Sequence, residues 1–526
     1  MEQRANASPS QLRRDAAAFP RLFDIRPESL QPVDSSERIV TVNRVRHFVF
    51  RRAAASAILT GLSLAAAALA LHAHAQNPSS ASNSFFGSVT VRPVSDEPLK
   101  LSLDEAIALG LKNNLGLKEA ENGEKSIKGQ KNEALQNFLP TITLTGDTGV
   151  HQHDLVSQGF GPGVAKKFSS LLPPGSVIAE ITRDELTEGQ IQFAQMLFSG
   201  PVIAGWKAAG AAERAAHFAK MSARGEVVQQ VASAYLHAIA ASSEVDNARA
   251  LESEDQVFAS QAHDAHIAGV AANLDELRAR VQLQAQQQML IAAQNALEKN
   301  LILLKREIGI DPGQKIALTD PAPYSELAAQ TPEEVRAVAY RNRQDYQNLQ
   351  NQAVEYKAIR SAYRSQRFPT LSFGGYYGVS QVNGAGSHGN FVAQGTLNLP
   401  LFREAKLRGD VESATAQMDA VNAQLDDLRG KIDQQVRSAL LDVSATAKLV
   451  EVARSNVELA TRALADETDR VNAGVDDNLP LVTAQATLAS AESNLVESLY
   501  QYNLSKLGLA RAAGIIETQY RDYLGR

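Results

Sequence analysis

Apolar side chains recur at intervals of seven along residues 436–471. Alanine or threonine stands three positions after most of them. These two spacings together are typical of α-helices that pack as a coiled coil, and alanine at the second position lets the helices approach closely. The apolar positions are Val436, Val443, Val450, Val457, Leu464 and Val471. The pattern predicts a very long helix that packs against a partner helix along one face.

A stretch in the first half of the chain carries the same spacing. Val231, Ala238 and Val245 lie seven residues apart, and the pattern weakens towards Glu252. We predict a helix from about Pro201 to Ala268, which would be about 100 Å long at 1.5 Å per residue. A helix of that length belongs to an elongated rod rather than to a globular domain.

Two pairs of shorter segments alternate apolar with polar residues, the period-two pattern of β-strands. In the first segment, Ile142 and Leu144 alternate with threonines. Pro140 and Pro369 precede the leading strand of each pair and should end the helices before them. The partner strands are predicted around Ile191 and Phe193, and around Leu397, Leu399 and Leu401.

The chain contains two copies of one unit. Residues 138–150 match residues 367–379 at an offset of 229, with five identical positions. The same offset relates two capping boxes, Ser102-x-x-Glu105 and Thr331-x-x-Glu334, each of which should open a helix. Further along, Ala268–Leu274 matches Ala473–Leu479 at an offset of 205. The first copy therefore has a longer loop, which falls between Val150 and Phe198.

Each copy is expected to run helix, strand, strand, long helix, turn, helix. We divide the chain into a leader and signal peptide (1–75), an N-terminal linker (76–100), a first repeat (101–309), a linker (310–330), a second repeat (331–514) and a C-terminal tail (515–526).

The N-terminal region is predicted to be a processing signal. Four arginines between Arg44 and Arg52 precede an apolar run over residues 53–71, and Ala73-His74-Ala75 follows it. This arrangement is typical of a secretory signal peptide, here cut after Ala75. A membrane anchor is the alternative interpretation, because 19 mostly apolar residues could just span a bilayer. Residues 1–43 form a polar leader of unresolved role.

Composition excludes several kinds of function. The 526 residues include no cysteine, so disulfides, thiolate metal sites and cysteine nucleophiles are absent. The formal net charge of −6 provides no basic surface for nucleic acid. Residues 1–75 hold 10 Lys/Arg and 6 Asp/Glu, so their removal leaves 42 basic and 52 acidic side chains, a net charge of −10.

Two strand pairs in a secreted chain raise the question of what covers their edges. An open sheet edge is not tolerated in lipid, and closed bacterial barrels begin at eight strands. Four strands per chain cannot close alone, so a membrane barrel would have to be shared between chains. The alternative is a soluble sheet at one end of a coiled-coil rod. Strand alternation alone does not decide between these two arrangements.

Three duplicated motifs resemble the TolC-like outer-membrane efflux protein family. Phe138-Leu-Pro-Thr-Ile142 and Arg367-Phe-Pro-Thr-Leu371 lead into the strands. Leu197-Phe198-Ser-Gly200 and Leu399-Pro-Leu-Phe402 follow them. The third motif, Ala-Gly-Val-x-x-Asn-Leu, occurs at Ala268 and at Ala473. The similarity covers roughly residues 101–514, with both copies in order.

The resemblance implies an α/β membrane protein that forms a homotrimer in the outer membrane of a Gram-negative bacterium. Its fold would combine a 12-stranded outer-membrane β-barrel, in contact with outer-membrane lipid, with a long periplasmic α-helical coiled-coil barrel. Such a protein is the exit duct of a tripartite efflux pump or a type I secretion system, passively exporting small molecules or polypeptides. Its partners would be a periplasmic adaptor protein and an inner-membrane transporter.

The resemblance also implies where the functional turns lie. The turns that join the paired helices would contact the adaptor and constrict the tunnel at Gly269, Asn273, Leu274, Gly474, Asn478 and Leu479. Candidate acidic residues of a gate or pore are Asp275 in the first turn and Asp476 and Asp477 in the second. Position 480, which matches Asp275, is proline. An acidic turn that is merely solvated is an equally simple interpretation.

Other functional classes receive less support. No nucleophile elbow, P-loop or zinc-hydrolase motif is present, so we predict no enzyme, no cofactor and no metal site. His263 and His266 lie three residues apart and could bind a metal or sense pH, but an exposed polar face is commoner. A periplasmic adaptor is the alternative function, although adaptors typically carry one helical hairpin. A trimeric coiled-coil surface fibre would lack the duplicated strands.

Overall fold

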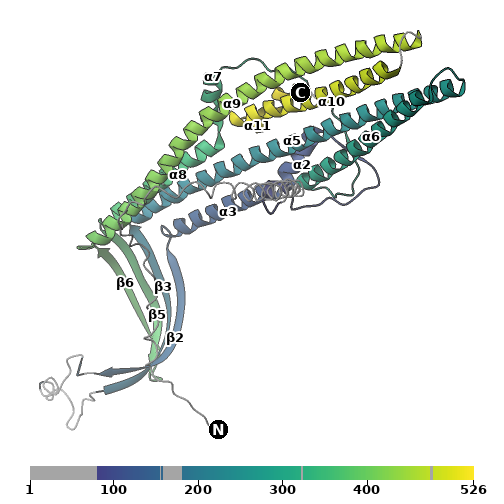
Figure 1. Cartoon of the computed structure of the whole chain (residues 1–526). Coiled ribbons are helices and arrows are strands. Elements are labelled where there is room, and N and C mark those ends of the chain that lie inside the picture. The colour runs from purple at the N-terminus through teal and green to yellow at the C-terminus, as the bar shows by residue number, and fades with distance from the viewer. Residues whose placement is uncertain are drawn as a thin grey trace, which may run out of the picture. The chain divides into compact units, whose positions relative to one another are not determined.

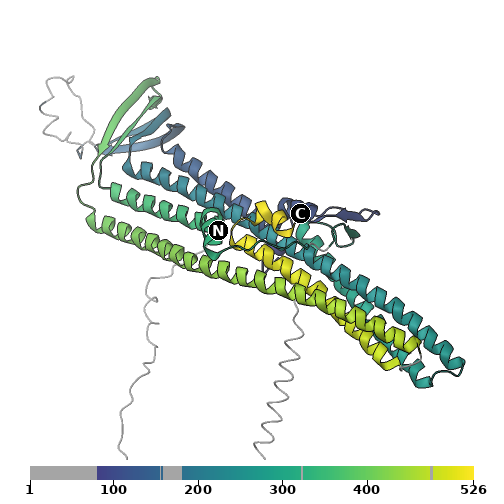
Figure 2. The same ribbon diagram turned by 90° about the horizontal axis from the view of Figure 1, so that it is seen from above.

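The computed structural model describes residues 80–525 except 155, 158–166, 168–180, 322–323 and 474–477. The predicted signal peptide, the first-copy loop between the strands and most of the second predicted turn lie outside the described residues. Residues 78–526 form one compact unit. Figure 1 shows its long helices and the sheet of β2, β3, β5 and β6, and Figure 2 shows them from a second direction.

Each strand pair is preceded by two short helices. In the first half these are α2 (Leu103–Asn113) and α3 (Leu115–Gln136), and in the second half α7 (Pro332–Asn342) and α8 (Gln344–Ser365). Both predicted capping boxes are confirmed, at Ser102 and Thr331. A short 3-10 helix, η1 (Ser84–Phe86), precedes them.

The leading helix of each half is broken, which the sequence analysis did not predict. Asn114 and Arg343, the residues between the two helices of each pair, have extended backbone conformations. The side chain of Asn114 then caps α3 by accepting bonds from the amides of Gly116 and Leu117.

Four strands form one antiparallel sheet in the order β2-β3-β5-β6. They are β2 (Thr141–Asp154), β3 (Ile181–Phe198), β5 (Thr370–Val382) and β6 (His388–Asn398). β2 continues four residues beyond Val150, where the duplicated segment ends. β6 ends before Leu399 and Leu401, so their predicted place in a strand is wrong. Pro400 lies between them, and its missing amide hydrogen cannot join a ladder.

The long helices form two pairs. α5 (Gly200–Ile267) turns into α6 (Asn273–Ile308), and α9 (Glu404–Asn472) is followed by α10 (Asn478–Ala512). The predicted helix from about Pro201 to Ala268 is thus confirmed within one residue at each end. Of the predicted heptad positions, Val231, Val436 and Val450 are completely buried.

The helices lie side by side in a fixed order. α5 contacts α3 and α6 on one side and α8 and α10 on the other, while α9 packs against α8 and α10. α3 and α6 lie end to end along one side of α5. α8 and α10 lie end to end along its other side. α6 and α9 therefore lie at opposite edges of this layer.

The main core lies where these helix ends meet. Tyr235, Leu304 and Leu507 are fully buried there, on α5, α6 and α10. The two linkers pair with each other as a short parallel sheet of β1 (Leu99–Leu101) and β4 (Ile316–Leu318). The last helix, α11 (Ile516–Leu524), packs on the same core.

Candidate functional site

One face of the four-stranded sheet is apolar and exposed. On β2, Leu144 is 78% exposed, and its cross-strand neighbour Ile191 is also exposed. The same face continues through Tyr377 on β5 and Phe391 on β6, which are paired with each other. The exposed apolar side chains of this face are Ile142, Leu144, Val150, Ile191, Leu371, Phe373, Tyr377, Val379, Phe391 and Leu397. We call this set the apolar sheet face.

The opposite face of the same strands is polar. Successive side chains of a strand point to opposite faces, so the residues between the apolar positions share the second face. Polar and charged residues occupy most of it, as at Thr143, Gln192, Gln394 and Thr396. Among the described residues, neither edge strand, β2 or β6, has a second strand partner. Polar and apolar surfaces are thus arranged as in a sheet that separates lipid from water.

The first predicted turn joins α5 to α6. Gly269 has a φ of +74°, and its amide donates to the carbonyl of His266. The amide of Val270 reaches back to the carbonyl of Ala265, which closes the end of α5. Leu274, in the first turn of α6, is exposed. The left-handed conformation explains why glycine occupies position 269.

Asn273 begins α6 and Asp275 lies two residues further, so these two candidates share the turn with Gly269. The Asp275 carboxylate is partly exposed and lies 3.4 Å from a guanidinium nitrogen of Arg278. A contact of that length between partly exposed groups contributes little to stability. Asp275 therefore remains an acidic group at the surface of the first turn.

The buried carboxylate of this region is Glu276, which the sequence analysis did not select. Its side chain is 7% exposed, and its Oε1 lies 2.9 Å from Nδ1 of His263 and 2.8 Å from Arg280. His266 is 3.9 Å away on the other oxygen. The hydrogen bond from His263 and the charge of Arg280 lower the pKa of Glu276. His263 thus links α5 to α6 through Glu276, and the side chains of both histidines are partly exposed.

The second predicted turn lies mostly outside the described residues. This applies to Gly474, Asp476 and Asp477. Asn478 and Leu479 begin α10, so their backbone is helical.

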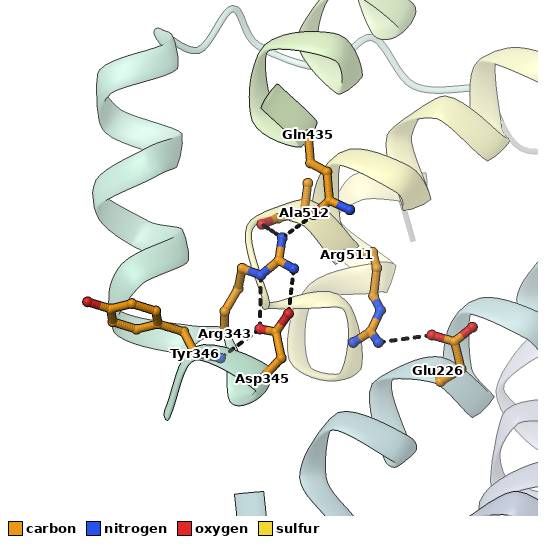
Figure 3. Close-up of polar contacts among 7 residues, drawn as sticks. All are labelled: Glu226, Arg343, Asp345, Tyr346, Gln435, Arg511 and Ala512. Carbon is orange, nitrogen blue, oxygen red and sulfur yellow. Dashed lines mark hydrogen bonds and ion pairs between the residues drawn. The ribbon is translucent and has the colours of Figure 1, made fainter. Parts of the chain in front are cut away.

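A polar network around Arg343 joins α8, α9 and α10 where α8 and α10 meet (Figure 3). Arg343 is 9% exposed and binds both carboxylate oxygens of Asp345, at 2.6 and 3.0 Å. It also donates to Gln435 on α9 and to the carbonyl of Ala512 at the end of α10. Burial by itself would raise the pKa of Asp345, but the bonds and charge of Arg343 outweigh it and hold that pKa low.

Beside this network, Arg511 forms an ion pair with Glu226 on α5 at 2.9 Å. A cavity of about 930 Å³ opens here between α5, α9 and α10, and Lys431, Gln435 and Asp442 contribute to its lining. The polar network and the cavity meet at the break in the second broken helix. Nothing in their arrangement resembles a catalytic constellation.

No group of histidine and carboxylate side chains within the described ranges has the geometry of a metal site. In the part of the chain that the structure describes, every helix lacks a stretch both long and apolar enough to span a membrane.

Comparison with known proteins identifies the family. The model of the outer membrane efflux protein family matches residues 106–309 and 337–515, most of the chain. The chain belongs to the outer membrane efflux protein family. It is accordingly a transport protein of TolC-like type, localised to the outer membrane of a Gram-negative bacterium.

Individual relatives are distant. The toluene efflux pump outer membrane protein TtgC of Pseudomonas putida is 26% identical over 264 residues. That alignment covers 47% of this chain and 51% of TtgC, so the chain spans about half the length of this curated relative.

Solved structures share the fold at still lower identity. The CmeC outer membrane channel of Campylobacter jejuni superposes with a TM-score of 0.63 at 15% identity, over 82% of this chain and 92% of CmeC. The open-state MtrE outer membrane channel of Neisseria gonorrhoeae gives 0.63 at 17% identity, over 82% and 96%. This efflux family member therefore has the helix-rich fold with a sheet that those channels have.

Proposed function

We propose that this family member is the exit duct of a tripartite efflux pump or a type I secretion system. Small molecules or polypeptides would pass through it passively across the outer membrane. The observation that carries the proposal is the apolar sheet face, which no described helix covers. A sheet with one exposed apolar face and one polar face is stable where lipid meets an aqueous channel.

The open edges of the sheet support a barrel shared between chains. Both β2 and β6 would be unpaired in lipid, where each unsatisfied backbone group costs several kcal/mol. Pairing β6 of one copy with β2 of the next satisfies both edges. Three copies give a 12-stranded barrel, the homotrimer that the family resemblance implies.

The helices at the two edges of the layer, α6 and α9, also support an arrangement in which one edge of each copy packs against the opposite edge of the next. α9 exposes Leu441, Val452 and Leu459, which share one side of the helix at spacings of 11 and 7 residues. At the opposite edge, α6 exposes Val281 and Ile291. Packing α9 of one copy on α6 of the next would bury both surfaces and close a helical coiled-coil barrel in the periplasm. The two edges differ, as a cyclic trimer requires.

The turns that join the paired helices would then lie at the periplasmic end of the duct. We place adaptor contact at Gly269, Asn273 and Leu274, with Gly474, Asn478 and Leu479 in the second turn. Asp275, Asp476 and Asp477 would line the constriction. The exposed side chain of Leu274 supports docking at the first turn. An inner-membrane transporter would supply the energy.

Two neighbouring residues on opposite faces of β2 provide the test. Leu144→Arg places a charge on the apolar sheet face, which costs about 2–4 kcal/mol at the bilayer midplane and less near its surfaces. Thr143→Arg, the matched control, places the same charge on the polar face. We expect Leu144→Arg to reduce trimer in the outer-membrane fraction several-fold, and Thr143→Arg to leave it unchanged.

If both variants accumulated as well as the wild-type protein and were recovered as soluble periplasmic protein, the membrane barrel would be contradicted. Recovery of the wild-type protein with the inner membrane would favour a periplasmic adaptor instead. If the trimer were lost in both variants, this part of the strand would tolerate no added charge. The pair Val150→Arg and Gly149→Arg would then repeat the test further along the strand.

A further inference from the structure

The strand ends nearest the helices carry exposed apolar residues. The register brings these ends together, because Thr141 lies opposite Ala194, and Thr370 opposite Asn398. At or directly outside these strand ends lie the exposed side chains of Leu139, Phe198, Phe368, Leu401 and Phe402. Leu401 and Phe402 are each 89% exposed, more than any other large apolar side chain of the described residues.

We call the segments that lead from β3 into α5 and from β6 into α9 the first and second strand exits. Basic residues follow directly in the sequence only at the second exit. Arg403 follows Phe402 directly, and Lys406 and Arg408 lie in the first turns of α9. All three side chains are exposed. At the first exit, Phe198 is followed by Ser199, Gly200 and Pro201, and the next basic residue is Lys207. In the sequence, the basic cluster is therefore specific to the second exit.

The local carboxylates do not neutralise this cluster. The carboxylate of Glu404 forms ion pairs with Arg367 at 2.8 Å and with Arg408 at 2.9 Å, so two guanidinium groups share one carboxylate. Lys406 is paired with Asp410 at 2.8 Å. Among the described residues, none forms a hydrogen bond or ion pair with the guanidinium group of Arg403. The exit has four cations against two carboxylates, a local charge of +2 beside exposed apolar side chains.

Exposed apolar side chains beside an excess of positive charge match the surface of a lipid leaflet. Apolar side chains favour the acyl region, and arginine binds phosphate through a planar fork of N–H donors. Basic residues next to a membrane attract anionic headgroups by about 1 kcal/mol each. A protein partner would also bury the apolar residues, but it would not require the excess of positive charge.

We propose that Arg403, with Lys406 and Arg408, binds the phosphate of an anionic phospholipid in the membrane leaflet on the helix side of the sheet. Leu401 and Phe402 contact the acyl chains of the same lipid. The site occurs once per chain, at the second strand exit. This inference rests on the proposed function, because it requires the sheet to span the membrane.

The test measures lipid binding to the purified full-length protein in detergent. Phosphatidylglycerol and phosphatidylcholine of identical acyl chains are titrated, and bound lipid is counted by native mass spectrometry. We expect wild-type protein to prefer phosphatidylglycerol. Arg403→Gln/Lys406→Gln should weaken that binding roughly 30-fold, which corresponds to about 1 kcal/mol for each residue. Phosphatidylcholine binding should not change.

Two controls separate charge from structure. Lys207→Gln removes the first basic residue after the first exit and should leave the preference intact. Arg403→Lys keeps the charge and should retain most of the binding. The oligomeric mass of each variant is measured in the same experiment.

Equal binding of the two lipids by wild-type protein would overturn the proposed site. Dissociation of the double variant into single chains would overturn it as well, because the residues would then belong to the contact between copies. Either result leaves the exit-duct function standing. A separate result would contradict the exit-duct function, namely that the wild-type protein is not recovered as a trimer in the outer-membrane fraction.

Discussion

Glu307, on the last turn of α6, is a buried acid in the main helical core. Its side chain is 3% exposed, and Gln230 donates to its Oε1 at 3.0 Å. The other oxygen, Oε2, is buried and has no hydrogen-bond partner among the described residues. Burial raises the pKa of Glu307 to about 7 from an ordinary value of 4.5. An ionised carboxylate in this place weakens the fold.

We expect Glu307→Gln to stabilise the protein in a pH-dependent way. The folded protein binds this proton more tightly than the unfolded chain, so the penalty of ionisation is absent below pH 4.5. It grows between about pH 4.5 and 7 and is constant above that, at about 3 kcal/mol. Chemical unfolding of both proteins should show the gain at about pH 8 and little of it at about pH 5. A gain of the same size at both pH values would contradict this account.

The turn after α5 depends on a glycine for its backbone conformation. Gly269 has a φ of +74°, and a Cβ added there would meet no atom within 4 Å. Gly269→Val would therefore clash with nothing, yet its backbone would be strained by about 1–2 kcal/mol or more. We expect the variant to remain a trimer and to lose efflux, because the strain acts on the turn and not on the core.

Gly123→Val is the matched control for that substitution. Gly123 lies in α3 with equally open space and an ordinary helical backbone. Drug susceptibility of cells that carry each variant, together with the trimer band on a detergent gel, distinguishes the two. Loss of the Gly269→Val trimer would show that the turn is needed for folding.

Most elements could be predicted because their signals are local. The heptads, the capping boxes at Ser102 and Thr331 and the alternation at Ile142 each depend on residues close in sequence. The broken helices could not be predicted in this way. Arg343 is fixed by Gln435 and Ala512, 92 and 169 residues away in the chain. No spacing within the sequence indicates such contacts.

The residues of the first turn also differ in whether a local signal in the sequence indicates them. Glycine and asparagine at its corner follow from the duplicated motif. Glu276 was missed because its burial and its bond to His263 depend on how α6 packs against α5. Its i,i+4 spacing to Arg280 was the one local signal that could have indicated it. The neighbouring Asp275, which the family pattern favoured, has only Arg278 as an ionic partner in the described structure.

At the scale of the whole molecule, the charge balance predicts a cation-preferring duct. Without residues 1–75 the chain has a net charge of −10, and an acidic constriction concentrates cations in a narrow aqueous path. Glu276 should contribute little to this field, because its carboxylate is buried and paired with Arg280 at 2.8 Å. Asp275 is partly offset by Arg278. The selectivity should therefore depend mainly on Asp476 and Asp477.

Reversal potentials in a salt gradient across planar bilayers measure this preference. We expect wild-type channels to favour cations, and Asp476→Asn/Asp477→Asn to lower the cation-to-anion permeability ratio more than Asp275→Asn does. Raising the ionic strength should reduce the preference in every variant, because salt screens charges separated by more than a Debye length. Anion preference in the wild-type channel would contradict the prediction. A larger effect of Asp275→Asn would place the dominant charge in the first turn instead.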